Sequence, residues 1–73
     1  MTNLAYNLRL LRNSLGLSTI ELSMELNMVT NRVSHIECGR NIRILPEEIA
    51  AIADFFKVSP EDLVEKKAIV VFI

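Results

Sequence analysis

The sequence has few cysteine, histidine, glycine and proline residues, and each shortage excludes a class of structure. The single cysteine, Cys38, cannot form an internal disulfide, and one cysteine with one histidine cannot supply the four ligands of a structural zinc site. Only two Gly and two Pro occur among 73 residues that are 51% hydrophobic, which excludes a disordered or low-complexity chain. We therefore expect one compact helical domain without a metal or other cofactor.

Long apolar runs are also missing. No run approaches the roughly 20 residues that a membrane-spanning helix needs, and no basic and then apolar leader opens the chain. We expect a cytoplasmic protein with no membrane partner. The sequence shows no nucleophile with a base, no pair of catalytic carboxylates and too little chain for a cleft, so we expect no enzyme and find no evident small-molecule ligand.

The net charge is small, but the charges are unevenly distributed along the chain. The formal net charge is -1. Residues 1–43 contain five Arg and three Glu, whereas residues 44–73 contain three Lys and six acidic residues. The positive charge therefore lies in the first part and consists of Arg alone, the residue type suited to bidentate contacts with phosphate and guanine.

Apolar spacing and capping signals predict two helices in the first third of the chain. The first begins at Thr2 or Asn3, ends at Gly16 and carries a helical stripe of leucines: Leu4, Leu8, Leu11 and Leu15. The second covers about residues 19–26, because Ser18 and Glu21 have the spacing of a capping box. Asn27 follows it and tolerates the positive φ of a sharp turn.

Three more helices are expected after this turn. The third covers about residues 29–38, with Val33 and Ile36 facing inward, small hydrogen-bonding side chains outside, and Gly39 at its end. Pro46 and Pro60 each fit the first turn of a further helix, where no amide donor is needed. The fourth helix carries its apolar side to the core, and the fifth is short and ends near Lys66.

The last six residues, AIVVFI, are apolar and rich in β-branched types, and this pattern predicts a strand over residues 68–73. We expect the helical domain to cover residues 1–67. Nothing else in the chain is left to pair with this strand. Our preferred interpretation is that two chains pair their tails about a two-fold axis. The tail could instead fold back onto the first and fifth helices, or lead into a further domain. Pairing would be made by Ile69, Val70, Val71, Phe72 and Ile73.

Two short helices joined by a turn, the second polar on its outer side, have the pattern of a helix-turn-helix. From Leu8 to about Glu65 the sequence resembles the phage repressor and Cro type of regulator, the XRE family. The matching motif residues are Leu17-Ser18, Leu22, Leu26, Met28, Val33-Ser34, Ile36-Glu37 and Gly39-Arg40. The resemblance implies an all-α, five-helix lambda-repressor-like DNA-binding domain, here with a C-terminal β-strand extension like the paired strands of Cro proteins.

The resemblance also assigns roles to individual residues. Arg12 and Glu37 fall where the family has a buried ion pair. The positions that face base edges in the major groove are matched by Thr30, Asn31, Ser34 and His35, with Arg32 nearby. The positions that contact phosphates are matched by Thr19, Arg40, Asn41 and Arg43.

The sequence departs from the family pattern at four positions. Thr19 replaces the usual Gln and weakens one phosphate contact, Ser23 replaces Ala, and Asn27 replaces the turn Gly. Val29 replaces the usual Ser or Thr cap, which leaves Thr30 as an alternative cap of the third helix.

These observations predict a sequence-specific double-stranded DNA-binding transcriptional regulator, a repressor, which reads the major groove with its third helix. A homodimer would bind a near-palindromic operator with half-sites about 34 Å apart. The alternative is a protein-interaction module of the same fold, an antitoxin or anti-repressor partner without specific DNA binding. Such a module would use the outer face of the third helix or the patch of Ile20 and Met24.

Overall fold

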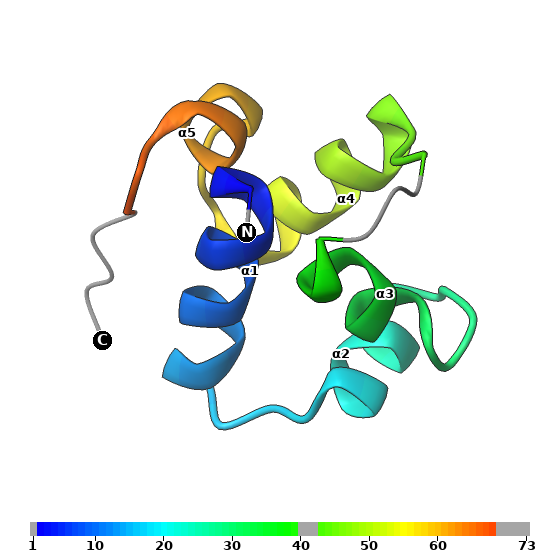
Figure 1. Ribbon diagram of the computed structural model, residues 1–73. Helices are drawn as coiled ribbons and strands as arrows, with labels where there is room; N and C mark the ends of the chain where they lie inside the picture. The colour runs from blue at the N-terminus through cyan, green and yellow to red at the C-terminus, as the bar shows by residue number, and fades with distance from the viewer. Residues whose placement is uncertain (1, 40–42, 69–73) are drawn as a thin grey trace.

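The computed structural model describes residues 2–39 and 43–68, which form five helices with a radius of gyration of 10.9 Å. The helix α1 packs against both α5 and α3, α2 packs against α3, and α4 packs against α5. Figure 1 shows α5 beside the N-terminal half of α1, with α2 beyond its other end. The elements are α1 (Asn3–Ser14), α2 (Thr19–Glu25), α3 (Arg32–Cys38), α4 (Pro46–Phe56) and α5 (Pro60–Glu65).

The expected C-terminal β-strand extension is wrong. The fold is all-helical, with no strand in residues 2–39 or 43–68. After α5 the backbone is extended at Lys66 and bends at residues 67 and 68. A strand needs a neighbouring strand to pair its amides and carbonyls, and the described chain contains only helices, so β-branched composition alone does not make one. Residues 69–73, which hold most of the expected strand and all of its proposed dimer contacts, lie outside the described residues.

All five helices contribute to one apolar core. Its buried members have the helical spacing predicted from the sequence: Leu4, Leu8, Leu11, Leu22, Val33, Ile36, Ile52, Ala53 and Leu63. The prediction for Leu15 is wrong, because this side chain is 55% exposed. Since α1 ends at Ser14, Leu15 is its C-cap, and Gly16 at φ +67° turns the chain away before another helical turn can form.

A buried amide joins α1 to the end of α5. The Nδ2 of Asn7 donates to the carbonyl oxygens of Leu63 at 2.9 Å and Lys66 at 2.8 Å. The Asn7 side chain is fully buried. The last carbonyls of a helix have no partner within it, so an amide supplied by another helix satisfies them. Asn7 therefore attaches the short helix α5 to the longest helix of the described chain.

Candidate nucleic-acid interface

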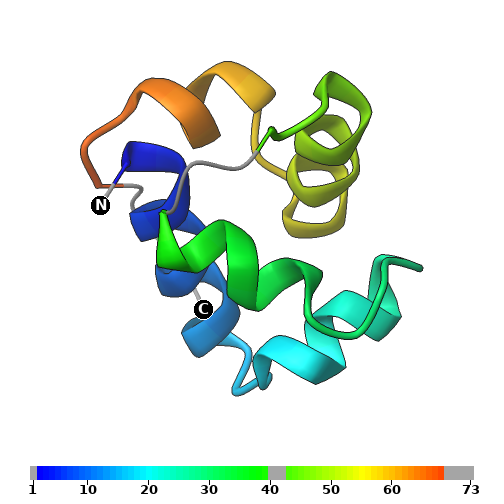
Figure 2. The same ribbon diagram turned by 45° about the vertical axis from the view of Figure 1, so that its right-hand side comes forward.

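The turn between α2 and α3 begins with a left-handed residue. Asn27 has φ +56°, as its sequence position predicted. Its N–H donates to the carbonyl of Met24 at 3.0 Å, and the N–H of Met28 donates to the carbonyl of Ser23 at 2.9 Å. This is the hydrogen-bond pattern of a Schellman motif, which ends α2 and reverses the chain toward α3. Figure 2 shows α2 (cyan) next to α3 (green), with the turn that joins them at the right.

The helix α3 begins at Arg32, later than the predicted start near residue 29. Val29 has no side-chain acceptor for an orphan amide, and its carbonyl instead accepts the N–H of Arg32 at 2.9 Å in a turn. Asn31 is the N-cap residue but makes no side-chain capping bond. Thr30 and Asn31 therefore lie in the turn that leads into α3.

Ser23 supplies the missing cap from another helix. The N–H of Val33, in the first turn of α3, donates to the Oγ of Ser23 at 3.1 Å. Both residues are fully buried, so no water reaches this amide to replace the hydroxyl. From the sequence, Ser23 is only a departure from the Ala of the family that the chain resembles; a hydroxyl next to Leu22 on the inner side of the second helix is the one signal of this role.

We expect Ser23→Ala to lower the free energy of unfolding by about 1–3 kcal/mol, because it leaves the buried Val33 amide without an acceptor. Urea denaturation measures the loss, and amide hydrogen exchange should show faster exchange at Val33. Ser14→Ala is the matched control, since the Ser14 hydroxyl bonds only to the Leu11 carbonyl of its own helix. Equal stability of the two variants would contradict the capping role of Ser23.

One side of the turn and of α3 is polar and open to solvent. Thr30, Asn31 and His35 are exposed and Ser34 is half-buried. On the opposite side of α3, Val33 and Ile36 are buried in the core. The side chains expected to face base edges therefore share an accessible surface, apart from Arg32.

Arg32 points to another part of the protein. Its Nε donates to Oε2 of Glu48 in α4 at 2.6 Å, and its Nη2 donates to Oε1 of the same carboxylate at 2.6 Å. The same Nη2 also donates to the carbonyl of Arg43 at 2.7 Å. The bonds from Arg32 lower the pKa of Glu48, and a bond from the backbone of Leu45 adds to this effect.

The other end of α3 is held by Glu37. The Nε of Arg12 lies 2.7 Å from Oε2 of Glu37, and its Nη2 donates to Oε1 at 2.9 Å. Arg9 adds a longer contact, with its Nε 3.4 Å from Oε1. Arg12 also donates to the carbonyl of Leu17 at 2.8 Å, so it joins α1, the following loop and α3. The hydrogen bond to Glu37 raises the pKa of Arg12.

The residues expected to contact phosphates are only partly described. Thr19 is half-buried at the first position of α2, and Arg43 is exposed before α4. Arg40 and Asn41 lie outside the described residues. Three of the described arginines, Arg9, Arg12 and Arg32, form ion pairs with glutamates of the same chain. Arg9 and Arg12 share Glu37, and the Arg9 side chain is 47% exposed, so the charges of Arg12 and Arg32 are balanced within the protein and that of Arg9 is balanced only in part.

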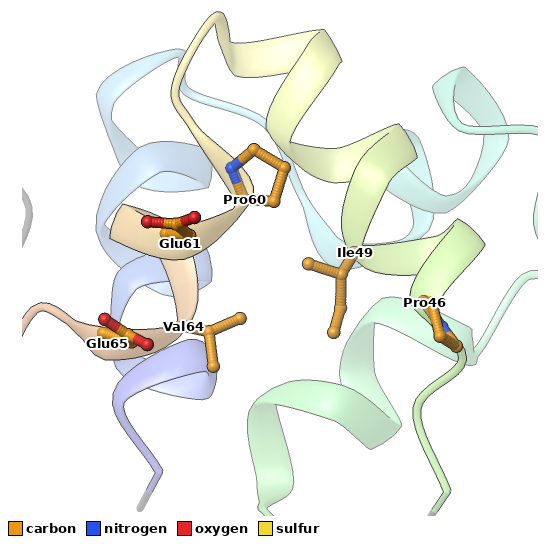
Figure 3. A pocket seen from close by; sticks show the side chains of 6 residues that line it. All are labelled: Pro46, Ile49, Pro60, Glu61, Val64 and Glu65. Carbon is orange, nitrogen blue, oxygen red and sulfur yellow. The ribbon is translucent and has the colours of Figure 1, made fainter.

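A groove of about 320 Å³ lies between α4 and α5. In Figure 3, Pro46 and Ile49 face Pro60 and Val64 across it, and the carboxylates of Glu61 and Glu65 lie along α5. An apolar groove with acidic residues beside it does not suit a polyanion.

Within residues 2–39 and 43–68, no three His, Cys, Asp or Glu side chains are grouped to hold a metal ion. No helix in the same residues has the length and apolarity to cross a membrane.

The sequence matches one protein-family model, described as a helix-turn-helix domain, over residues 3–66. The matched region contains all five helices and ends at the C-cap of α5. No curated protein and no solved structure matches the chain.

Proposed function

Because the chain belongs to the helix-turn-helix domain family, we propose that it is a sequence-specific double-stranded DNA-binding transcriptional regulator of the phage repressor and Cro type. It acts as a repressor by occupying an operator in the cytoplasm. Its role is to bind, not to catalyse. The protein reads the major groove with α3 and with the turn that leads into it.

The observation that carries this proposal is the open polar surface formed by Thr30, Asn31, Ser34 and His35. Val33 and Ile36 anchor the opposite side of α3 in the core, so this surface faces outward on a fixed support. An Asn side chain pairs bidentately with adenine, and Ser or Thr hydroxyls bond to several base edges. His35 would donate to a guanine acceptor.

We also propose that phosphate contacts fix the register of the domain on the duplex. Arg43 is exposed next to α4, and Thr19 is partly exposed at the start of α2. Arg40 and Asn41 are assigned the same role from their sequence positions. Such contacts position the protein but carry no base information.

The proposed binding unit is a homodimer on a near-palindromic operator, with two α3 helices in major-groove half-sites about 34 Å apart. The sequence of residues 69–73 is wholly apolar, and contact between two chains would remove it from water. The proposed dimer contacts are Ile69, Val70, Val71, Phe72 and Ile73.

Electrophoretic mobility shift with DNA upstream of the chain's own gene tests this function. The wild-type protein should retard one fragment specifically, and Asn31→Ala should weaken this binding roughly 10- to 100-fold, because it removes one bidentate base contact. Asn3→Ala is the matched control, since Asn3 is the first residue of α1 and its amide donates to the carbonyl of Glu65 at the end of α5, away from the surface of α3. Sedimentation of the same preparations, and of a chain ended after Lys67, reports whether the tail makes the dimer.

A second candidate function is a protein-interaction module of the same fold. Ile20 and Met24 favour it, because they lie one helical turn apart on α2 and are 52% and 66% exposed. Exposed apolar residues of this kind suit a protein partner better than a phosphate backbone. A folded dimer that retards no DNA at low salt would favour this candidate over the regulator.

A further inference from the structure

Arg32 is the first residue of α3, yet its guanidinium is directed toward α4 and the segment before it. Three hydrogen bonds hold it there, two to the carboxylate of Glu48 and one to the carbonyl of Arg43. The side chains of Arg32 and Glu48 are 19% and 15% exposed. A planar guanidinium bound to both oxygens of a carboxylate is held in orientation as well as position.

The same carboxylate organises the start of α4. Oε1 of Glu48 accepts the N–H of Leu45, the N-cap residue of α4, at 3.0 Å. Glu48 therefore satisfies an orphan amide of its own helix while it binds the first residue of α3. Glu48 thus joins the beginnings of α3 and α4, and Arg32 adds a bond to the carbonyl of Arg43.

The start of α3 depends on such outside support. The helix has seven residues, and its N-cap residue makes no side-chain capping bond. Of its first two residues, Val33 is held by Ser23 of α2 and Arg32 by Glu48 of α4. These two links therefore hold the first turn of α3, which follows Thr30 and Asn31.

We propose that Arg32 and Glu48 are positioning residues, which set the angle of α3 and the placement of Arg43 for DNA binding without themselves contacting DNA. This inference rests on the proposed function. It replaces the base-reading role that the sequence assigned to Arg32. A base-reading Arg32 would first have to give up both bonds to Glu48.

The variant Glu48→Gln distinguishes between the two possible roles of Arg32, because they predict opposite changes in DNA affinity. If Arg32 contacts bases or phosphates, the substitution frees it and removes a negative charge, so DNA binding should strengthen. If the pair positions α3, binding should weaken despite the more favourable charge, by about 3- to 30-fold, as expected for a residue that acts without touching the ligand. Glu47→Gln is the matched control, since Glu47 is exposed in the same first turn of α4.

Operator affinity is measured for wild type, Glu48→Gln and Glu47→Gln at a temperature where circular dichroism shows each variant folded. Weaker binding by Glu48→Gln alone supports the proposal; binding equal to or tighter than wild type overturns it. If Glu48→Gln does not fold, Glu48→Asp takes its place, because it keeps the charge but shortens the side chain. Weaker binding by Glu48→Asp again supports the proposal, and unchanged binding overturns it.

A measurement without DNA distinguishes failure of this inference from failure of the proposed function. Amide chemical shifts of Arg32, Val33 and Ser34 should change in Glu48→Gln and stay constant in Glu47→Gln. Unchanged shifts in Glu48→Gln would overturn the positioning role. A wild-type protein that binds no DNA would refute the regulator proposal alone, and the amide shifts would still test the link between α3 and α4.

Discussion

Replacing Glu37 with alanine is expected to lower the free energy of unfolding by about 2–4 kcal/mol, because it leaves the charge of Arg12 without its partner in a largely buried position. The Glu37 side chain is 5% exposed and that of Arg12 is 14% exposed. This remaining exposure places the expected loss at or below the lower part of the range of about 3–5 kcal/mol for broken buried pairs. A domain of this size has only about 3–5 kcal/mol from its core, so the variant should keep about 1 kcal/mol of stability and populate the unfolded state measurably.

Urea denaturation of three variants tests this expectation. Glu25→Ala is the control for loss of a carboxylate, since Glu25 is exposed on α2, and its stability should stay within about 0.5 kcal/mol of wild type. The double variant Arg12→Met with Glu37→Met should be more stable than Glu37→Ala, because removing both charges leaves none buried alone. If Glu37→Ala and Glu25→Ala unfold at the same urea concentration, the pair does not hold α1 to α3.

Asn7→Ala should destabilise the protein by about 2–4 kcal/mol. It removes the hydrogen bonds of the Asn7 amide to the carbonyls of Leu63 and Lys66, which lose this donor, and opens a small void in the core. The amide protons of α5 should then exchange with solvent faster than those of α1, because α5 loses its attachment.

Asn3→Ala is the control for this prediction as well. The Asn3 amide donates to the carbonyl of Glu65 at 3.1 Å, but this bond is exposed and water can replace it. We expect a loss below about 0.5 kcal/mol for Asn3→Ala. If both variants lose a similar amount of unfolding free energy, burial does not increase the contribution of the Asn7 hydrogen bonds to stability.

Local signals predicted the helices well where a side chain bonds to its own segment. The capping box of Ser18 and Glu21 is present, with the two bonds at 3.0 Å and 2.9 Å. Asn27 and Gly16 have the left-handed backbone expected at helix ends. These features depend on residues a few positions apart, so a single sequence contains the information for them.

Features that depend on distant segments could not be predicted from the sequence. The start of α3 depends on Ser23 in α2, and the hydrogen bonds of Arg32 depend on Glu48, sixteen positions along the chain. No periodic pattern indicates either bond. The tail was assigned to a strand from its β-branched residues, although a strand also requires a partner that composition cannot supply.

The sequence predicts which residues near α3 are exposed, but it does not predict the contacts that hold α3 in place. Thr30, Asn31 and His35 are exposed because the spacing of Val33 and Ile36 determines which side of the helix is buried, and that spacing can be read from the sequence. The parts that hold this surface in place, Ser23 and Glu48, emerged only from the three-dimensional contacts.

The ion pairs of Arg9, Arg12 and Arg32 limit how strongly this chain can attract bulk nucleic acid. Binding without base recognition depends on uncompensated cations that displace counterions from the phosphates. Glu37 and Glu48 already bind the guanidiniums of Arg12 and Arg32, and Arg9 shares Glu37, so only part of the charge of these three residues is available to phosphates. A regulator with these ion pairs would bind non-specific DNA weakly. Its occupancy of a target site would depend mainly on short-range contacts with the bases.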